Sequence, residues 1–147
     1  MTVYRITTAK WAGKLAGSGR AARWNSNGLF MIYTAGTRAL ACLENLAHRK
    51  AIGPNETFKI TLINIPDNIR IEKIVPHKLP GDWKEYIKYN ICQAIGDEWI
   101  HQLSSAVLRV PSAIIPEEYN YLINPAHPDF SKISISELEN FIFDERL

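Results

Sequence analysis

Glu44 is the residue of this chain whose surroundings most suggest chemistry, because it is the only acidic residue among the first fifty positions. That segment also contains eight Lys and Arg residues, whereas the rest of the chain has nine of them against fourteen acidic residues. In a helix, Glu44 would lie at the edge of an apolar stripe, with His48 one turn further along. The residues of that stripe are Ala39, Leu40, Leu43, Leu46 and Ala47. A single carboxylate beside the core, in a basic segment, indicates a site for an anionic ligand.

The same spacing has a simpler interpretation, in which Glu44 only pairs with His48 or Arg38 on a solvated helix edge. The loop before the helix adds a second chemical group, since Arg23 and Trp24 are adjacent there. A guanidinium can hold a phosphate through two parallel N–H bonds, and an indole can stack on a base. The basic residues are spread over strand, helix and loop, which argues against binding of a polynucleotide.

Other motifs carry less chemistry. Ser112 follows an apolar run, but no histidine–carboxylate pair can be assigned to it, so a ligand contact or a plain strand end is expected. Residues 17–22 fit the pattern G-x-G-x-x-A, yet no strand precedes them and no helix follows, which excludes a Rossmann site. The four histidines and two cysteines show no metal-ligand spacing, and we expect no metal site.

Length and composition predict one soluble domain over residues 1–147. The hydrophobic fraction is 46%, the charged fraction 22% and the net charge +2. Cys42 and Cys92 lie in apolar helical contexts and are expected to be reduced thiols. The N-terminus lacks a signal-peptide pattern, and no apolar run has membrane-spanning length, so a cytoplasmic location is expected.

Periodicity predicts an α+β fold, with a mixed, mostly antiparallel sheet and flanking helices. Thr34 is the expected N-cap of a helix over about residues 36–50, and Gly96 is expected to interrupt a helix that begins at Trp83 and continues to residue 101. Further expected features are a short helix over residues 9–16 and a turn at residues 53–55. The expected strands and extended runs are residues 2–7, 29–34, 57–65, 69–75, 106–110, 114–115, 119–124 and a last strand containing residues 141–143.

Several motifs together make the chain similar to the RES-domain proteins. They are Arg23-Trp24-Asn25-Ser26, Tyr33-Thr34, Leu43-Glu44-x-Leu46-x-His48, Gly96-Asp97-Glu98-Trp99, Leu108-Arg-Val-Pro-Ser112 and the segment Asn120–Phe130. The resemblance runs from Tyr4-Arg5 nearly to the C-terminus. It departs in the loop, where Ala21-Ala22 replace the usual glycine and Asn27 the usual proline.

This resemblance implies a core like that of ADP-ribosyltransferases and the toxin half of a bacterial RES–Xre toxin–antitoxin pair. The family's catalytic arginine, tyrosine and glutamate map onto Arg23, Tyr33 and Glu44. The residues predicted to bind substrate are Arg5, Trp24, Asn25, His48, Ser112 and Asn124. NAD⁺ would be the substrate, with no further cofactor. The implied partner is an Xre-type helix-turn-helix antitoxin that covers the site in a hetero-oligomer, so this chain itself would bind no DNA.

The sequence thus predicts a toxin that depletes NAD⁺ by cleaving the nicotinamide–ribose bond, through hydrolysis or phosphorolysis. A negative charge near the ribose suits the oxocarbenium-like transition state of that reaction. Two alternatives stay open at this point. One is an ADP-ribosyltransferase that modifies a cellular protein from the same site, and the other is a non-catalytic nucleic-acid-binding module.

Overall fold

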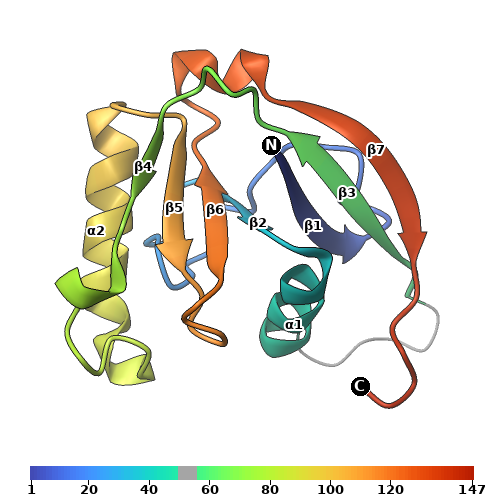
Figure 1. The fold of residues 1–147 in the computed structure, drawn as a ribbon, viewed down its shortest axis with the longest axis horizontal. Helices are drawn as coiled ribbons and strands as arrows, with labels where there is room; N and C mark the ends of the chain where they lie inside the picture. The colour runs from blue at the N-terminus through green and yellow to red at the C-terminus, as the bar shows by residue number, and fades with distance from the viewer. Residues whose placement is uncertain (50–55) are drawn as a thin grey trace.

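The strands of this protein form one seven-stranded sheet, in the order β4-β5-β6-β2-β1-β3-β7 (Figure 1). The structure is a computed structural model that describes residues 1–49 and 56–147. Only the β4–β5 pair is parallel, so the predicted α+β class with a mostly antiparallel sheet is confirmed. The strands are β1 Thr2–Thr8, β2 Ile32–Ala35, β3 Phe58–Asn64, β4 Ile71–Lys73, β5 Val107–Pro111, β6 Tyr119–Ile123 and β7 Ser134–Phe141.

The sheet is nearly divided in the middle. β1 pairs with β2 at the single position Tyr4↔Ala35, whereas β1 and β3 pair over seven positions. The strands β4, β5, β6 and β2 therefore form one half-sheet, and β1, β3 and β7 form the other. In Figure 1 the two groups of strands diverge from the β2–β1 contact, and helix α1 lies beside that opening.

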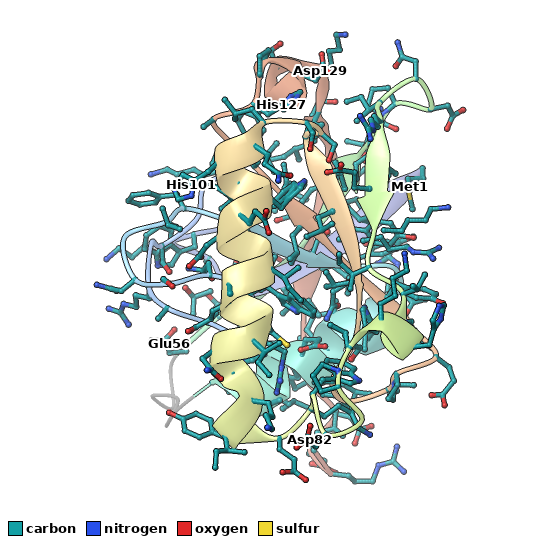
Figure 2. All side chains as sticks on the ribbon, turned by 90° about the vertical axis from the view of Figure 1, so that its left-hand side faces the viewer. Met1, Glu56, Asp82, His101, His127 and Asp129 are labelled. Atoms are coloured by element: carbon teal, nitrogen blue, oxygen red, sulfur yellow. The ribbon has the colours of Figure 1, made fainter. Side chains whose placement is uncertain are left out.

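Two α-helices, α1 (Arg38–His48) and α2 (Tyr89–Gln102), pack against the sheet. Thr37 begins α1, because its hydroxyl accepts a hydrogen bond from the amide of Leu40. Figure 2 shows α2 running in front of the strands, with His101 near its C-terminal end. Short 3₁₀ helices occupy Pro76–Lys78 (η1), Tyr86–Lys88 (η2) and Pro128–Lys132 (η3).

Each half-sheet has its own apolar core. Trp99 and Cys92 of α2 pack with Trp24 of the loop and with β5 and β6. Leu40 and Ala41 of α1 pack with Ile6 of β1 and with β3. A third cluster, which includes Val3, Ile63 and Ile123, joins strands of both halves. Of the apolar stripe predicted for α1, only Leu40 is fully buried, whereas Ala39 and Ala47 are exposed. The buried face is instead centred on Leu40 and Ala41, a residue outside the predicted stripe.

Three local predictions at the N-terminal side were wrong. Thr34 is not the N-cap of α1 but a residue of β2, where its hydroxyl donates to the carbonyl of Tyr121. The strand expected at residues 29–34 is limited to Ile32–Ala35, and residues 9–16 form turns and irregular chain rather than a helix. The turn expected at residues 53–55 lies outside the described residues.

In the second half of the chain, the helix expected from Trp83 begins only at Tyr89, because the residues before it form turns and the 3₁₀ helix η2. The strand expected at residues 69–75 shortens to β4, which joins the edge of the sheet far from β3. Residues 114–115 belong to a bend, and the last strand ends at Phe141.

Gly96 does not interrupt α2. A Cβ atom at this position would overlap the carbonyl oxygen of Trp24, so glycine is required for the close approach of the helix to the loop. The helix continues through Gly96 to Gln102 with no break in its backbone. Glycine is needed at this position only because it has no side chain.

Candidate active site

A pocket of about 860 Å³ lies where the two half-sheets diverge. Its walls come from β1, β2, α1, the loop of residues 18–24 and the chain around η2. It contains both basic and acidic groups: Arg5, Arg20, Arg23, Arg49, Lys84 and Glu44. Four arginines from the basic first third of the chain therefore line the same pocket as the one carboxylate of that segment.

Glu44 is fixed in this pocket by groups from the opposite side of the site. Its Oε1 atom accepts hydrogen bonds from the Ser112 hydroxyl at 2.8 Å and from the Asn120 amide at 2.7 Å. Its Oε2 atom lies 3.2 Å from Nε2 of His48. The pairing with His48 that the simpler interpretation expected is present, but it is only one of three contacts. Arg38 instead pairs with Glu139.

The Glu44 side chain is only 19% exposed, so its charge state depends on these contacts. Burial raises the pKa of the carboxyl, while hydrogen bonds from His48, Asn120 and Ser112 lower it, and the net pKa lies below the usual value. The site therefore holds Glu44 as an ionised carboxylate at neutral pH.

Ser112 is fully buried at the end of β5 and is oriented from both sides. Its hydroxyl donates to Glu44 and accepts from the backbone amides of Ile114 and Ile115, at 3.1 and 3.2 Å. The Ser112 hydroxyl keeps its proton and donates a hydrogen bond to Glu44, while two backbone amides occupy the lone pairs of its oxygen. In this arrangement Ser112 positions the carboxylate and does not act as a nucleophile.

Arg23 lines the pocket with its guanidinium already oriented. Its two terminal nitrogens donate to the carbonyls of Trp83 and Lys84, at 3.1 and 3.0 Å. The guanidinium also lies 4.6 Å from the ring centroid of Tyr89. These contacts use two of its five N–H donors and hold the group flat, so further donors stay available to a ligand.

Tyr33 lines the pocket from β2, and its hydroxyl is used within the protein. The hydroxyl donates to Oδ1 of Asn25 and accepts from the amide of Trp24 at 3.1 Å. Burial raises the pKa of Tyr33 well above its usual value, so the phenol stays protonated. Because the hydroxyl is occupied, the aromatic ring is the part of Tyr33 that remains for contact with a ligand.

Asn25 lies beneath the pocket and does not line it. It is 1% exposed, and its amide donates to the carbonyls of Arg20, Ser26 and Leu29. Trp24, also buried, lines the pocket from the same loop. Both polar atoms of the Asn25 side chain form hydrogen bonds that shape the loop carrying Arg23. The structure therefore gives Asn25 a structural role in place of the predicted substrate contact.

Asp97 is a functional position that residue chemistry alone did not single out. Its carboxylate accepts from the backbone amide of Ser26 at 2.8 Å and from the Ser26 hydroxyl. Together with the close approach at Gly96, this bond fixes the loop to α2. The only sequence signal for it was the motif Gly96-Asp97-Glu98-Trp99.

The contact with the site that was expected of Asn124 is made by Asn120, for which the sequence predicted no role. Asn124 is buried beyond the end of β6, bonded to Ile100 and Ala126, and is not in the pocket wall. Asn120, at the start of the same strand, is the residue that reaches Glu44. Four strand residues separate the two by about 13 Å, so only one of them could serve this site.

The remaining predicted site residues also have definite places. Arg5 lines the pocket from β1 and donates to the carbonyl of Ala16 at 2.9 Å. His48 lies at the exposed rim on α1.

Within residues 1–49 and 56–147, no group of three or more His, Cys, Asp or Glu side chains is arranged to hold a metal ion. No helix in that part of the chain combines the length and apolar character needed to cross a membrane.

Comparison with known proteins places this arrangement in a family. A family model described as the RES domain matches residues 2–144. The chain is 36% identical over 141 residues to a protein of Sphingobium sp. (strain YBL2) named Prs ADP-ribosylating toxin, with 92% of this chain and 88% of the relative covered.

Two further relatives carry the name Toxin Res. The protein of Photorhabdus laumondii subsp. laumondii is 36% identical over 159 residues, covering 100% of this chain and 97% of its own length. The protein of Yersinia enterocolitica is 34% identical over 152 residues, covering 100% and 99%. With a family match over nearly its whole length, this chain belongs to the RES-domain family.

Proposed function

We propose that this RES-domain protein is a toxin that consumes NAD⁺ by breaking the bond between nicotinamide and ribose. The observation that carries the proposal is the fixed, ionised carboxylate of Glu44 in a pocket whose other charged wall residues include four arginines. Two neutral donors, Ser112 and Asn120, hold one carboxylate oxygen, which leaves the negative charge free to face a cationic reacting group.

The reaction needs a negative charge that is already in place. As the C1′–N bond breaks, its electron pair leaves with neutral nicotinamide, and positive charge develops on the ribose. Glu44 would stabilise that charge without any reorganisation, because its hydrogen bonds exist before substrate binds. A water molecule or a phosphate then attacks C1′, and for water the released proton passes to solvent or to the carboxylate.

The other two predicted catalytic residues fit complementary roles. The ring face of Tyr33 is available to stack on nicotinamide, whereas its hydroxyl is not, because Asn25 and Trp24 use it. The remaining donors of Arg23 would bind a phosphate oxygen of the dinucleotide. Arg5 supplies a second positive group across the pocket.

The names of the relatives support the toxin part of this proposal. Two of them are named Toxin Res. We therefore propose that a separate antitoxin, of the Xre helix-turn-helix type that the resemblance implies, binds over this pocket and blocks it. Binding of DNA would then belong to the antitoxin and not to this chain.

A second candidate function is transfer of ADP-ribose to a protein. The relative named Prs ADP-ribosylating toxin, at 36% identity, favours it directly. Both functions use the same bond cleavage and differ only in the acceptor. We place transfer to water or phosphate first, because the pocket residues described above can all act on NAD⁺ itself without a docked protein.

Purified protein, freed of antitoxin, tests the choice. It should release nicotinamide from NAD⁺ with no protein present, giving ADP-ribose, or its phosphorylated form if added phosphate raises turnover. Incubation of labelled NAD⁺ with cell lysate should leave little label on protein. Heavy labelling of one band, with nicotinamide released only when that protein is added, would establish the transferase instead. A salt-dependent affinity for RNA or DNA that survives Glu44→Gln would favour the nucleic-acid-binding alternative.

A further inference from the structure

A second, smaller pocket of about 370 Å³ adjoins the first. The two share five wall residues: Arg5, Ile6, Ser18, Asn45 and Arg49. The smaller pocket adds residues from the end of β1, the turn after it and the start of β3: Thr7, Thr8, Trp11, Glu56 and Phe58. Because the walls are continuous, one extended ligand can occupy both pockets.

Helix α1 directs two neighbouring side chains to the two halves of this space. Glu44 bonds to Ser112 and Asn120 on the β5–β6 side. The next residue, Asn45, donates to the carbonyl of Ile6 on β1 at 3.0 Å. Arg49 follows Asn45 by one turn, on the same side of the helix. The smaller pocket therefore begins directly beside the proposed reacting centre.

The junction of the two pockets carries positive charge without a matching carboxylate. Arg5 donates to one backbone carbonyl, and burial lowers its pKa. Arg49 lies over the rings of Phe58 and Phe143, at 5.7 and 4.3 Å from their centroids. Among the described residues, neither arginine forms an ion pair. A buried cation of this kind is stabilised by a bound anion.

An aromatic platform borders the same pocket. Trp11, in the turn after β1, is 43% exposed. Exposed indole faces bind bases by stacking, without requiring a particular base. Glu56 is the only carboxylate in this wall, and it is exposed, at the edge of the described chain (Figure 2). The pocket thus combines cations at its inner end with an aromatic ring at its entrance.

We propose that the smaller pocket binds the adenosine monophosphate half of NAD⁺, with Arg5 and Arg49 on its one phosphate and Trp11 stacked on adenine. This inference rests on the proposed function, since it assumes that the nicotinamide ribose lies at Glu44. The dinucleotide would then run from the β5–β6 side, across the junction at Arg5, to the turn after β1.

The opposite end of the larger pocket offers the competing location. Tyr86 and Tyr89 lie there with ring centroids 5.1 Å apart, next to Arg23 and Lys84. Arg23, however, already donates to two backbone carbonyls and lies against Tyr89. Arg5 has only one such partner, so its charge is the less satisfied of the two, and the observations favour the Trp11 end.

Binding of adenosine monophosphate, measured by calorimetry, separates the two ends without requiring turnover. Trp11→Ala should weaken this binding roughly tenfold, the effect of losing one stacked base, and Arg49→Ala should weaken it as well. Binding of nicotinamide mononucleotide should stay unchanged in both variants. Ile142→Ala removes a 90% exposed apolar side chain outside both pockets and should leave both ligands unaffected.

The outcomes are distinct. If Trp11→Ala leaves adenosine monophosphate binding intact, or if Tyr86→Ala weakens it instead, the inference is overturned. The same holds if the wild-type protein does not bind this nucleotide. If binding depends on Trp11 but the protein releases no nicotinamide from NAD⁺, the smaller pocket is a nucleotide site and the proposed function is the part that fails. In an active protein, Trp11→Ala should raise KM for NAD⁺ about tenfold with kcat nearly unchanged.

Discussion

At Glu44, one carboxylate oxygen is held by two neutral donors and the other contacts only the exposed His48. This difference between the two oxygens matters because Ser112 and Asn120, which fix the carboxylate, carry no charge of their own. They orient the carboxylate without neutralising it. An arginine in place of Ser112 or Asn120 would hold Glu44 as firmly but would remove the field that a developing cation needs.

Replacing Glu44 by glutamine tests this charge alone. Glu44→Gln keeps the shape and an acceptor for Ser112 and Asn120, so the protein should still fold, with only a modest loss of stability at neutral pH from the missing charge. Nicotinamide release should fall by on the order of 10²–10³, as expected for loss of one electrostatic stabiliser. Glu98→Gln, an exposed change on α2, is the control and should have no effect on turnover. A folded Glu44→Gln protein with near wild-type activity would remove Glu44 from the mechanism.

Substitutions of Arg23 separate the effect of its planar shape from the effect of its positive charge. Its planar group bridges two carbonyls and lies on the ring of Tyr89, which a lysine ammonium cannot reproduce. Arg23→Lys should therefore lose nearly as much activity as Arg23→Ala. Lys10→Ala and Lys14→Ala, at exposed positions outside the pocket wall, should be close to silent. If all four variants behave alike, the basic segment acts through its overall field.

At the scale of the elements, the site depends on how closely α2 approaches the loop of residues 20–28. Gly96 permits the contact with the Trp24 backbone, and Asp97 bonds to Ser26 in the same loop. The loop in turn carries Arg23. A helix that contributes no residue to the pocket beyond Tyr89 at its first turn thus determines where a predicted catalytic group lies.

Gly96→Ala should disrupt this contact. The added methyl overlaps the carbonyl of Trp24, and overpacking of this kind costs about 3 kcal/mol or more of unfolding free energy. Gly81→Ala is the matched control, because no atom lies within 4 Å of its added methyl. Denaturant melts should show a large loss for the first variant and little change for the second. Equal stabilities would mean that the close approach of α2 to Trp24 is not required.

At the scale of the whole molecule, folding gathers charge that the sequence spreads out. Arginines at positions 5, 20, 23 and 49, from strand, loop and helix end, all reach one pocket. Glu44 lines the same pocket. The result is a pocket with several positive wall residues suited to phosphates and one fixed negative group suited to a cationic ring.

The pH dependence of stability should report Glu44 directly. Its folded pKa lies below the ordinary value of 4.5, so its ionised form stabilises the fold above that pH, and this contribution is lost as the pH falls through the folded pKa. The stability difference between wild type and Glu44→Gln, measured by denaturation from about pH 7 to about pH 3, should therefore shrink on acidification. A difference that grows toward low pH would imply a raised pKa and an uncharged acid.

The sequence by itself determined the type of most strands and helices and the chemistry of the candidate residues. Alternation over residues 57–65 is a local property, so it predicted β3 correctly. Helical spacing likewise placed Glu44 at the edge of an apolar stripe, next to His48. The motifs shared with RES-domain proteins identified the family, which the match over residues 2–144 confirms. The catalytic roles of Arg23, Tyr33 and Glu44 stay predictions.

Tertiary structure alone decided which polar residues meet. Ser112 and Asn120 reach Glu44 across 68 and 76 residues of sequence, whereas Asn124, equally polar and just beyond the end of the strand that carries Asn120, bonds to the carbonyl of Ile100 instead. From its neighbours in sequence, Gly96 was expected to break the helix. In the fold, the carbonyl of Trp24 occupies the space that a side chain at position 96 would need. Periodicity and propensity describe residues that are close together along the chain. These contacts depend instead on the pairing of strands that are far apart in sequence. In such a pairing, a shift of one residue moves a side chain to the other face of the sheet.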